Sequence, residues 1–168
     1  MALFVSLVIA TLVGGLATPR KHSVGRTIAL HAPPEKVWAL IRTVKDYPNW
    51  REEIMRVEEM AGNDPRPAWT EIGRQKSLSY TAVTDEPPVR FTARIMDDDL
   101  GYSGEWQYVI TPCTEGTRLT ITEHGEVGNL MFRFISTHLI GHTRTIDAFL
   151  RDVALELGEL AKPEPANA

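Results

Sequence analysis

Apolar and polar side chains alternate from residue 27 to residue 32, which is the period of a strand with one buried face. Pro34 and Glu35 then open a helix, because proline suits the first helical turn and a carboxylate is favourable at the positive end of the helix dipole. The helix carries one apolar stripe, formed by Val37, Leu40, Ile41 and Val44. The corner Tyr47-Pro48-Asn49-Trp50 ends it, since the residue before a proline is pushed out of helical geometry.

The middle of the chain is predicted to form strands separated by clusters of Gly, Pro and Asp. One further helical turn is expected first, at residues 51–54. The expected strands are 55–60, 68–72, 74–84, 89–96, 104–111 and 117–127. Short strands joined by turns are typical of an antiparallel sheet.

From residue 129 to residue 160 the apolar period changes to three and four, which predicts a long amphipathic helix. Its apolar positions are Ile135, Leu139, His142, Ile146, Phe149, Val153, Leu157 and Leu160. Gly141 and Gly158 are expected to weaken this helix without ending it. A sheet with one apolar face offers the matching surface, so we expect an α+β fold in which an antiparallel sheet curls around the terminal helix.

Length, charge and cysteine content limit the number of domains and the kinds of partner and site that the chain can have. A chain of 168 residues suffices for one domain with a core. The net charge of −4 and the scattered basic residues argue against a nucleic-acid partner. Cys113 is the only cysteine, which excludes an internal disulfide and a cysteine-based zinc site. We expect it to be a small, half-buried residue in a turn.

The two ends of the chain are expected to lie outside the folded domain, which spans residues 22–161. Residues 1–21 are predicted to be a hydrophobic anchor or signal, because residues 1–18 carry no charge and would form a helix of about 27 Å, just short of a bilayer's hydrocarbon thickness. The basic residues that follow favour a membrane-anchored domain on the cytoplasmic side. The alternatives are cleavage after Gly15-Leu16-Ala17 with export, or a packed or disordered soluble tail. Residues 162–168 are predicted to be disordered.

Four sequence blocks carry a resemblance to a known family. They are Ile28-x-Leu30-x-Ala32-Pro33-Pro34-Glu35-Lys36-Val37-Trp38-x-x-Ile41, Val44-x-Asp46-Tyr47-Pro48-x-Trp50, Trp106-x-Tyr108-x-Ile110-x-Pro112 and the run from Gly116 to Glu123. With them, residues 24–160 resemble the polyketide cyclase/dehydrase branch of the START and Bet v 1-like (SRPBCC) superfamily. The resemblance implies a helix-grip fold, with two short helices after the first strand and a deep apolar cavity between sheet and helix. It also implies a lipid, isoprenoid or polycyclic aromatic ligand, and an enzyme only sometimes, because the family includes both cyclases and carriers.

Strand parity and the helix period predict which side chains face this cavity. They are Phe91, Ala93, Ile95, Trp106, Tyr108, Ile110, Leu119, Ile121, Ile135, Leu139, His142 and Ile146. Glu123 continues the buried parity of its strand, and a carboxylate in an apolar interior is a candidate for proton transfer. Alternatively, the strand leaves the core at Glu123, or the carboxylate pairs with an arginine. Tyr47 and Trp50 are expected to anchor the core rather than to contact a ligand.

His142 occupies an apolar step of the helix, where it could act on a ligand or be a packed residue with one satisfied nitrogen. His138 precedes it by four residues, the spacing of two metal ligands, and Glu123 or His124 could be imagined as a third. No metal site is predicted, because nothing else supports one. The run Asp97-Asp98-Asp99 lacks the further oxygens of a calcium loop and is expected to be a solvated turn.

Three functional hypotheses follow. The first is a membrane-tethered carrier or sensor that binds a hydrophobic small molecule and uses no cofactor. The second is a cyclase or dehydrase in which Glu123, His142 and Tyr108 transfer protons. The third is a protein-interaction module whose partner the sequence does not identify.

Overall fold

The structure is a computed structural model that describes residues 21–61, 65–97, 102–127 and 143–166. The predicted N-terminal anchor, apart from Lys21, lies outside the described residues, as does the part of the last helix expected over residues 129–142. Within the described residues, no helix combines the length and apolar composition needed to cross a membrane.

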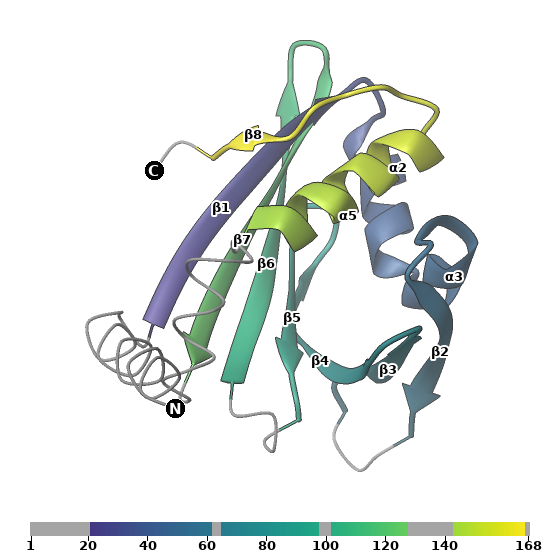
Figure 1. Cartoon of the computed structure of the whole chain (residues 1–168). Helices are drawn as coiled ribbons and strands as arrows, with labels where there is room; N and C mark the ends of the chain where they lie inside the picture. The colour runs from purple at the N-terminus through teal and green to yellow at the C-terminus, as the bar shows by residue number, and fades with distance from the viewer. Residues whose placement is uncertain (1–20, 62–64, 98–101, 128–142, 167–168) are drawn as a thin grey trace, which may run out of the picture.

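Eight antiparallel strands form one sheet, in the order β2-β3-β4-β5-β6-β7-β1-β8 (Figure 1). The first strand is β1 (Lys21–Leu30), followed by helix α2 (Pro34–Arg42), the 3-10 turn η1 (Val44–Asp46) and the short helix α3 (Tyr47–Trp50). Next come β2 (Ile54–Met60), β3 (Ala68–Gly73), β4 (Ser77–Glu86), β5 (Arg90–Ile95), β6 (Tyr102–Cys113), β7 (Gly116–Val127), α5 (Thr143–Glu156) and β8 (Glu164–Pro165). The predicted strands and their antiparallel pairing are confirmed.

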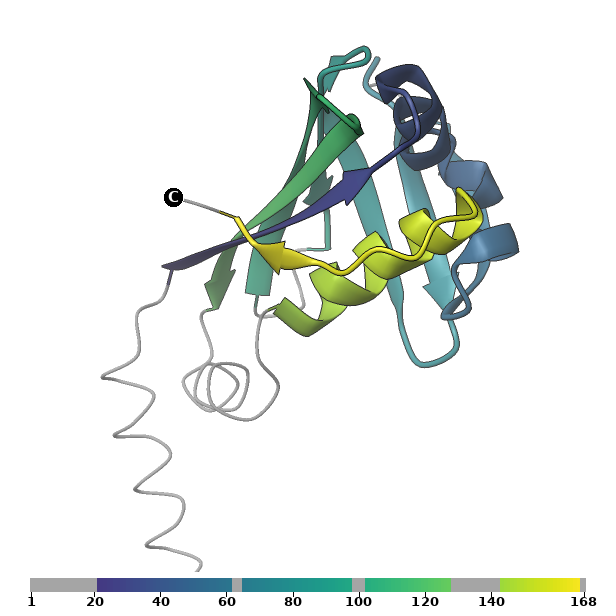
Figure 2. The ribbon, with the colours of Figure 1, turned by 90° about the horizontal axis from the view of Figure 1, so that it is seen from above.

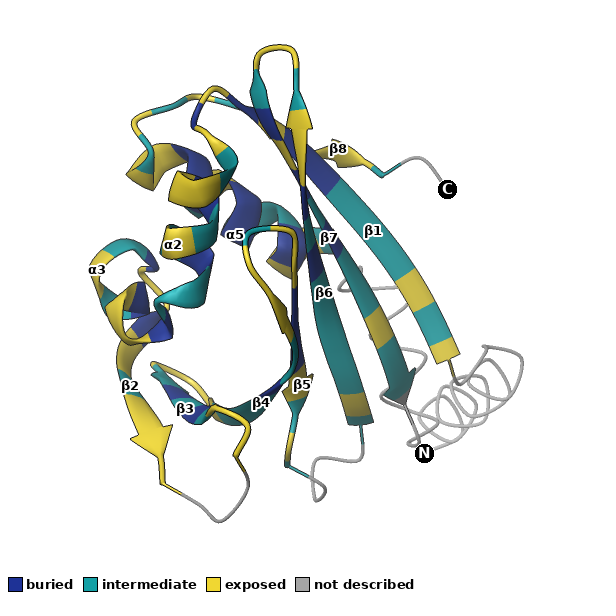
Figure 3. Ribbon diagram, turned by 180° about the vertical axis from the view of Figure 1, so that it is seen from behind, coloured by how far each residue is buried: buried dark blue, intermediate teal, exposed yellow. Residues whose placement is uncertain are grey.

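The sheet curves, and α5 lies in the hollow of the curve, with α2 and α3 beside it (Figures 1 and 2). Helix α5 buries the apolar side that its sequence predicts, including Ile146, Phe149 and Val153. The strands present alternate residues to the same core, which Figure 3 shows as buried positions along the central strands and on α5. This arrangement is the expected helix-grip fold, and burial of both apolar faces stabilises it.

The last helix ends earlier than predicted. Gly158 has a φ of +77°, and its N–H donates to the carbonyl of Leu155 while that of Glu159 donates to the carbonyl of Ala154. This pattern is a Schellman motif, in which a left-handed glycine terminates the helix. Gly158 therefore ends the helix instead of merely weakening it, and Leu160, predicted in the apolar stripe, is 95% exposed.

The further helical turn predicted at residues 51–54 is instead a single hydrogen-bonded turn, in which the N–H of Ile54 donates to the carbonyl of Arg51 over 3.0 Å. Arg51 already has an extended backbone, with φ −112° and ψ 106°, and Ile54 begins β2. The short helix closes with the N–H of Arg51 donating to the carbonyl of Tyr47, after which the chain turns directly into the sheet.

The tail predicted to be disordered forms β8, which pairs with β1 at the edge of the sheet. Arg26 holds it in place, since its NH2 group donates to the carbonyl of Pro163 over 3.1 Å while the same side chain forms an ion pair with Asp147 of α5. The proline-rich composition indicated disorder, but proline is tolerated in an edge strand, where its missing N–H faces away from the neighbour.

Candidate functional site: a cavity beside helix α5

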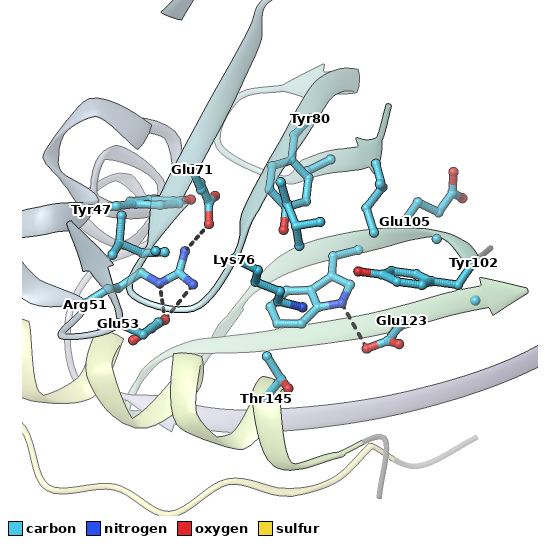
Figure 4. Close-up of a pocket in the computed structure, with 18 of the residues that line it drawn as sticks. Tyr47, Arg51, Glu53, Glu71, Lys76, Tyr80, Tyr102, Glu105, Glu123 and Thr145 are labelled. Atoms are coloured by element: carbon cyan, nitrogen blue, oxygen red, sulfur yellow. Dashed lines mark hydrogen bonds and ion pairs between the residues drawn. The ribbon is translucent and has the colours of Figure 1, made fainter. Parts of the chain in front are cut away.

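A cavity of about 590 Å³ lies between the concave face of the sheet and the start of α5. Its apolar wall is formed by Ile54, Trp69, Leu78, Ala93, Ile95, Trp106 and Tyr108. Polar side chains from several strands also face it, and Figure 4 shows them pointing toward the same space from opposite sides.

The cavity occupies only one end of the apolar face that strand parity defines. Of the predicted lining residues, Ala93, Ile95, Trp106 and Tyr108 line it, together with the predicted catalytic residue Glu123. The others that the structure describes are fully packed in the core, namely Phe91, Ile110, Leu119, Ile121 and Ile146. The predicted Ile135, Leu139 and His142 lie outside the described residues.

Helix α2 explains why the other end of the face is closed. It contacts β6 and β7, and Trp38 meets Phe91 edge-on with ring centroids 6.4 Å apart. In the antiparallel register, Ala93 lies opposite Trp106, and Trp106 opposite Glu123. The cavity therefore begins at the row formed by Ala93, Trp106 and Glu123, beyond the part of the sheet that the helices cover.

Glu123 is the polar centre at this end of the cavity. The indole N–H of Trp106 donates to one carboxylate oxygen over 3.0 Å, and Nε2 of His22 lies 3.2 Å from the other. The ring of His22 packs over Gly125, where any Cβ would collide with it. The partners of Glu123 are a tryptophan and a histidine, so the pairing with an arginine is not observed. The side chain of Glu123 is 22% exposed whereas Ile121 is fully buried, so β7 leaves the densely packed core at this point, as the other alternative predicted.

Arg51 is the polar centre on the opposite side. Its guanidinium donates to Glu71 over 3.0 Å and to Glu53 over 2.7 and 2.9 Å, and it lies over the rings of Tyr47 and Phe149 (Figure 4). Burial alone would lower the pKa of Arg51, but the charges of Glu71, Tyr47 and Glu53 raise it overall. The arginine is therefore permanently charged, and its charge is balanced by two carboxylates of the protein.

Tyrosine hydroxyls supply hydrogen-bond donors in the cavity. Burial, with a further contribution from nearby charges, raises the pKa of both Tyr80 and Tyr108, so both phenols stay protonated at neutral pH. Neither hydroxyl bonds to another residue of the part of the chain that the structure describes, so both can donate to a ligand oxygen. By contrast, the hydroxyl of Tyr47 donates to the carbonyl of Ile41 over 2.6 Å.

Tyr47 and Trp50 pack against each other and against Phe149, as expected of core anchors. Tyr47 also lines the cavity, although it was expected only to anchor the core and was not among the predicted lining residues.

Several lining residues were not predicted. Glu71 follows Trp69 with the same parity, so the signal that identified Glu123, a carboxylate on the buried side of a strand, was present there too. His22 was missed because the first strand was expected to begin at Thr27, whereas it begins at Lys21. Thr145 and Lys76 gave no signal, because isolated polar residues near turns are common.

No group of three His, Cys, Asp or Glu side chains that could hold a metal ion occurs within residues 21–61, 65–97, 102–127 and 143–166. His138 lies outside those ranges. Asp97 accepts a hydrogen bond from the backbone N–H of Ser79 over 2.7 Å, so its carboxylate joins the end of β5 to β4, while Asp98 and Asp99 of the predicted turn lie outside the described residues. Cys113 is half-buried at the end of β6, as expected.

Three solved structures of known proteins share the fold. The di-domain aromatase/cyclase StfQ from the steffimycin biosynthetic pathway superposes with a TM-score of 0.66 at 8% identity, covering 79% of this chain and 50% of that one. The Zhui aromatase/cyclase from Streptomyces sp. R1128 gives 0.66 at 15% identity, covering 82% and 94%. A START superfamily protein from Mycobacterium smegmatis gives 0.63 at 17% identity, covering 82% and 97%.

At these identities the structural likeness shows the fold alone. A search of curated protein sequences found no significant match. The sequence profile of the family described as polyketide cyclase / dehydrase and lipid transport matches residues 21–158, which is most of the chain. The match and the fold agree with the resemblance carried by the sequence blocks, and the chain belongs to this polyketide cyclase/dehydrase and lipid transport family.

Proposed function

We propose that this protein binds a hydrophobic small molecule, such as a lipid, an isoprenoid or a polycyclic aromatic compound, in the cavity beside α5. The observation that carries the proposal is a cavity of about 590 Å³ whose wall is largely apolar and aromatic. Cavities of this size and composition are typical of small-molecule sites, in which a few fixed polar groups orient the ligand.

The polar groups of the wall suit a ligand that carries oxygen. Tyr80 and Tyr108 offer phenol donors, whereas the guanidinium of Arg51 is already paired with Glu53 and Glu71. A carbonyl or hydroxyl group of the ligand would find its partners among these tyrosines, while its apolar body would displace water from the aromatic wall.

A role as a membrane-tethered carrier or sensor extends this proposal. Residues 1–18 are apolar and uncharged, and they are followed by Arg20 and Lys21. Hydrophobic ligands dissolve in the bilayer, so a tether on the cytoplasmic side would keep the cavity close to their source.

The binding proposal is tested by native mass spectrometry and solvent extraction of the purified protein, followed by binding measurements with a lipid and isoprenoid panel. Ala93→Leu places additional methyl groups on the cavity wall and is expected to weaken binding at least tenfold. The matched control is Ala29→Leu, on the exposed face of β1, with circular dichroism to check that both variants fold. A cavity that stays empty against the whole panel would overturn the proposal.

A second candidate is a cyclase or dehydrase reaction, which one observation favours. Glu123 faces the cavity between Trp106 and His22, so a carboxylate and an imidazole stand at hydrogen-bonding distance beside the ligand space. Such a pair can accept and return a proton as a general base and acid. Tyr108 could donate to the same substrate, and His142 retains its predicted role as a proposal.

If the protein is a cyclase or dehydrase, Glu123→Gln is expected to lower turnover by about 10²- to 10⁴-fold, which is the usual contribution of general acid–base catalysis. Turnover is measured by mass spectrometry with poly-β-ketone analogues. Unchanged turnover in Glu123→Gln and in His22→Ala would exclude the Glu123 pair as the catalytic group, whereas unchanged ligand binding with lost turnover would support it.

A further inference from the structure

We propose that the ligand of this cavity is an amphiphile with an anionic head group, a carboxylate or a phosphate, and that Arg74 and Lys76 bind that head group at the rim. The inference rests on the ligand-binding function proposed above and specifies the chemical class of the ligand. It follows from the distribution of paired and unpaired charges around the cavity.

Almost every charged side chain of the described cavity wall already has a partner within the protein. The pairs are Arg51 with Glu53 and Glu71, Glu105 with Arg94, and Glu123 with His22. Each carboxylate of the wall is therefore occupied, and the charge of the buried guanidinium is balanced by Glu53 and Glu71. A ligand anion placed deep in the cavity would meet no unpaired cation there.

Arg74 and Lys76 are the exception. Both line the cavity, both are exposed, and neither forms an ion pair with another residue of the described chain. In Figure 4 the side chain of Lys76 lies between the Arg51 side and the Glu123 side of the cavity. These two cations, with the amide of Gln75 between them, form a group of donors that matches the oxygens of a carboxylate or phosphate.

The turn that carries these residues is fixed to the sheet. The N–H of Gly73 donates to the carbonyl of Lys76 over 2.9 Å, and the N–H of Arg74 donates to the carbonyl of Glu53 over 3.3 Å. The two cations therefore project from a backbone that is held in place, which lowers the entropy lost when they bind an anion.

The apolar wall begins directly behind the turn, with Ile54, Leu78 and Ile95. An amphiphile can thus place its chain against this wall while its head group stays at the rim, in contact with both water and the two cations. This orientation avoids the large cost of burying an ionised group without a partner. Because the cations are exposed, they add selectivity more than affinity.

The test compares dodecanoate with 1-dodecanol, which have the same chain and differ in head-group charge, by intrinsic tryptophan fluorescence of the full chain. We expect dodecanoate to bind about three- to tenfold more tightly at low salt, with a preference that shrinks as ionic strength rises. Dodecyl phosphate is the third probe and distinguishes a phosphate-selective rim from a carboxylate-selective one.

The double variant Arg74→Gln, Lys76→Gln is expected to bind 1-dodecanol as the parent does and to lose the preference for dodecanoate. Lys36→Gln, which removes an exposed lysine of α2 away from the cavity, is the matched control and should keep the preference.

The outcomes separate this inference from the function on which it rests. Equal binding of dodecanoate and 1-dodecanol would overturn the anionic head group and leave a neutral hydrophobic ligand. A preference that survives in the double variant would overturn the assignment to Arg74 and Lys76. Failure of all three probes to bind, in a folded protein that binds another member of the lipid and isoprenoid panel, would overturn the inference alone, whereas a cavity that also stays empty against that panel would contradict the binding function.

Discussion

Arg51 joins the elements that form the side of the cavity opposite Glu123. It is 8% exposed, and it joins the end of α3 to β3 through Glu71 and to α5 through the ring of Phe149. Glu71 in turn accepts a hydrogen bond from the indole N–H of Trp69 over 3.2 Å. A buried ion pair of this kind gives little net stability over an apolar pair, but each partner is costly to remove alone.

We expect Arg51→Met to lower the free energy of unfolding by about 3–5 kcal/mol, because Glu71 would remain buried without its cation. The double variant Arg51→Met, Glu71→Gln should recover part of that loss. Urea denaturation provides the measurement. The control is Arg56→Met, whose exposed pair with Glu58 should be worth about 1 kcal/mol or less. Equal losses in Arg51→Met and Arg56→Met would contradict the role given to the buried pair.

The phenol of Tyr108 predicts how stability depends on pH. Burial holds its pKa well above the ordinary value of 10.0 in the folded chain, whereas the unfolded chain releases this proton near 10.0. The folded state therefore binds the proton more tightly, so the stabilisation is complete below about pH 10 and is lost as the pH rises further.

Urea denaturation at pH 8 and at pH 11 should show this fall, and Tyr108→Phe should reduce it because the variant has no phenol proton to lose there. Tyr102→Phe, at a half-buried site, is expected to reduce the fall less. A pH dependence that is identical in Tyr108→Phe and in the parent protein would refute the assignment.

At the scale of single residues, the sequence indicates which side of a strand is buried but not what fills the space beside it. Parity correctly put Glu123 on the inner face, and the same reasoning applied to Glu71 would have found it. Parity could not separate Ala93, which lines the cavity, from Phe91, which is packed under α2. That difference depends on where the helices lie, which a periodic pattern does not specify.

At the scale of elements, the hydrophobic periods predicted the strands well and the helix ends poorly. Periodicity continues through Leu157 and Leu160, yet α5 stops at Glu156 because the following residues form a Schellman motif. The motif directs the chain so that the carboxylate of Glu159 accepts hydrogen bonds from the N–H groups of His31 and Ala32, over 2.7 and 3.0 Å. The end of α5 thereby holds the loop that leads into α2.

Gly158→Ala is expected to destabilise the protein by about 1 kcal/mol, because alanine is strained at the φ of +77° that this position requires. No atom lies within 4 Å of a Cβ built there, so the effect is purely one of the backbone. Gly158→Asn should cost less, since asparagine tolerates the left-handed region. Thermal unfolding measures both variants, and an alanine variant as stable as the parent would contradict the left-handed cap.

At the scale of the whole molecule, the sheet has two edges that differ in how they are protected. The outer strand β2 carries exposed charges, including Arg56, Glu58 and Glu59, which oppose pairing with another chain. On the other side, β8 covers part of β1, and Ala166 donates its N–H to the carbonyl of Gly25 over 3.1 Å.

Removing residues 163–168 is expected to uncover this part of β1 and to increase self-association, measured by light scattering after size-exclusion chromatography. The hydrogen bonds that are lost predict a fall in stability of about 1–3 kcal/mol. Removing only residues 167–168 is the control. A truncated protein whose self-association and stability match those of the parent would show that β8 has no protective role.

The overall architecture was the most predictable feature, because a sheet and a helix with matching apolar faces have few ways to pack. The cavity was predictable only as a consequence of family resemblance, since an empty space leaves no periodic trace in a sequence. The tail was mispredicted because composition does not report a contact such as that between Arg26 and Pro163, which joins positions far apart in the chain.

The start of β1 bears on how a ligand would reach the cavity. His22 lines the cavity although it is only the second residue of the first strand. His22 is four positions after Thr18, the end of the apolar stretch, and an extended chain covers about 14 Å over that distance. With residues 1–18 in a bilayer, as proposed, the cavity could not drift far from the surface, and a ligand would pass between membrane and protein without crossing bulk water.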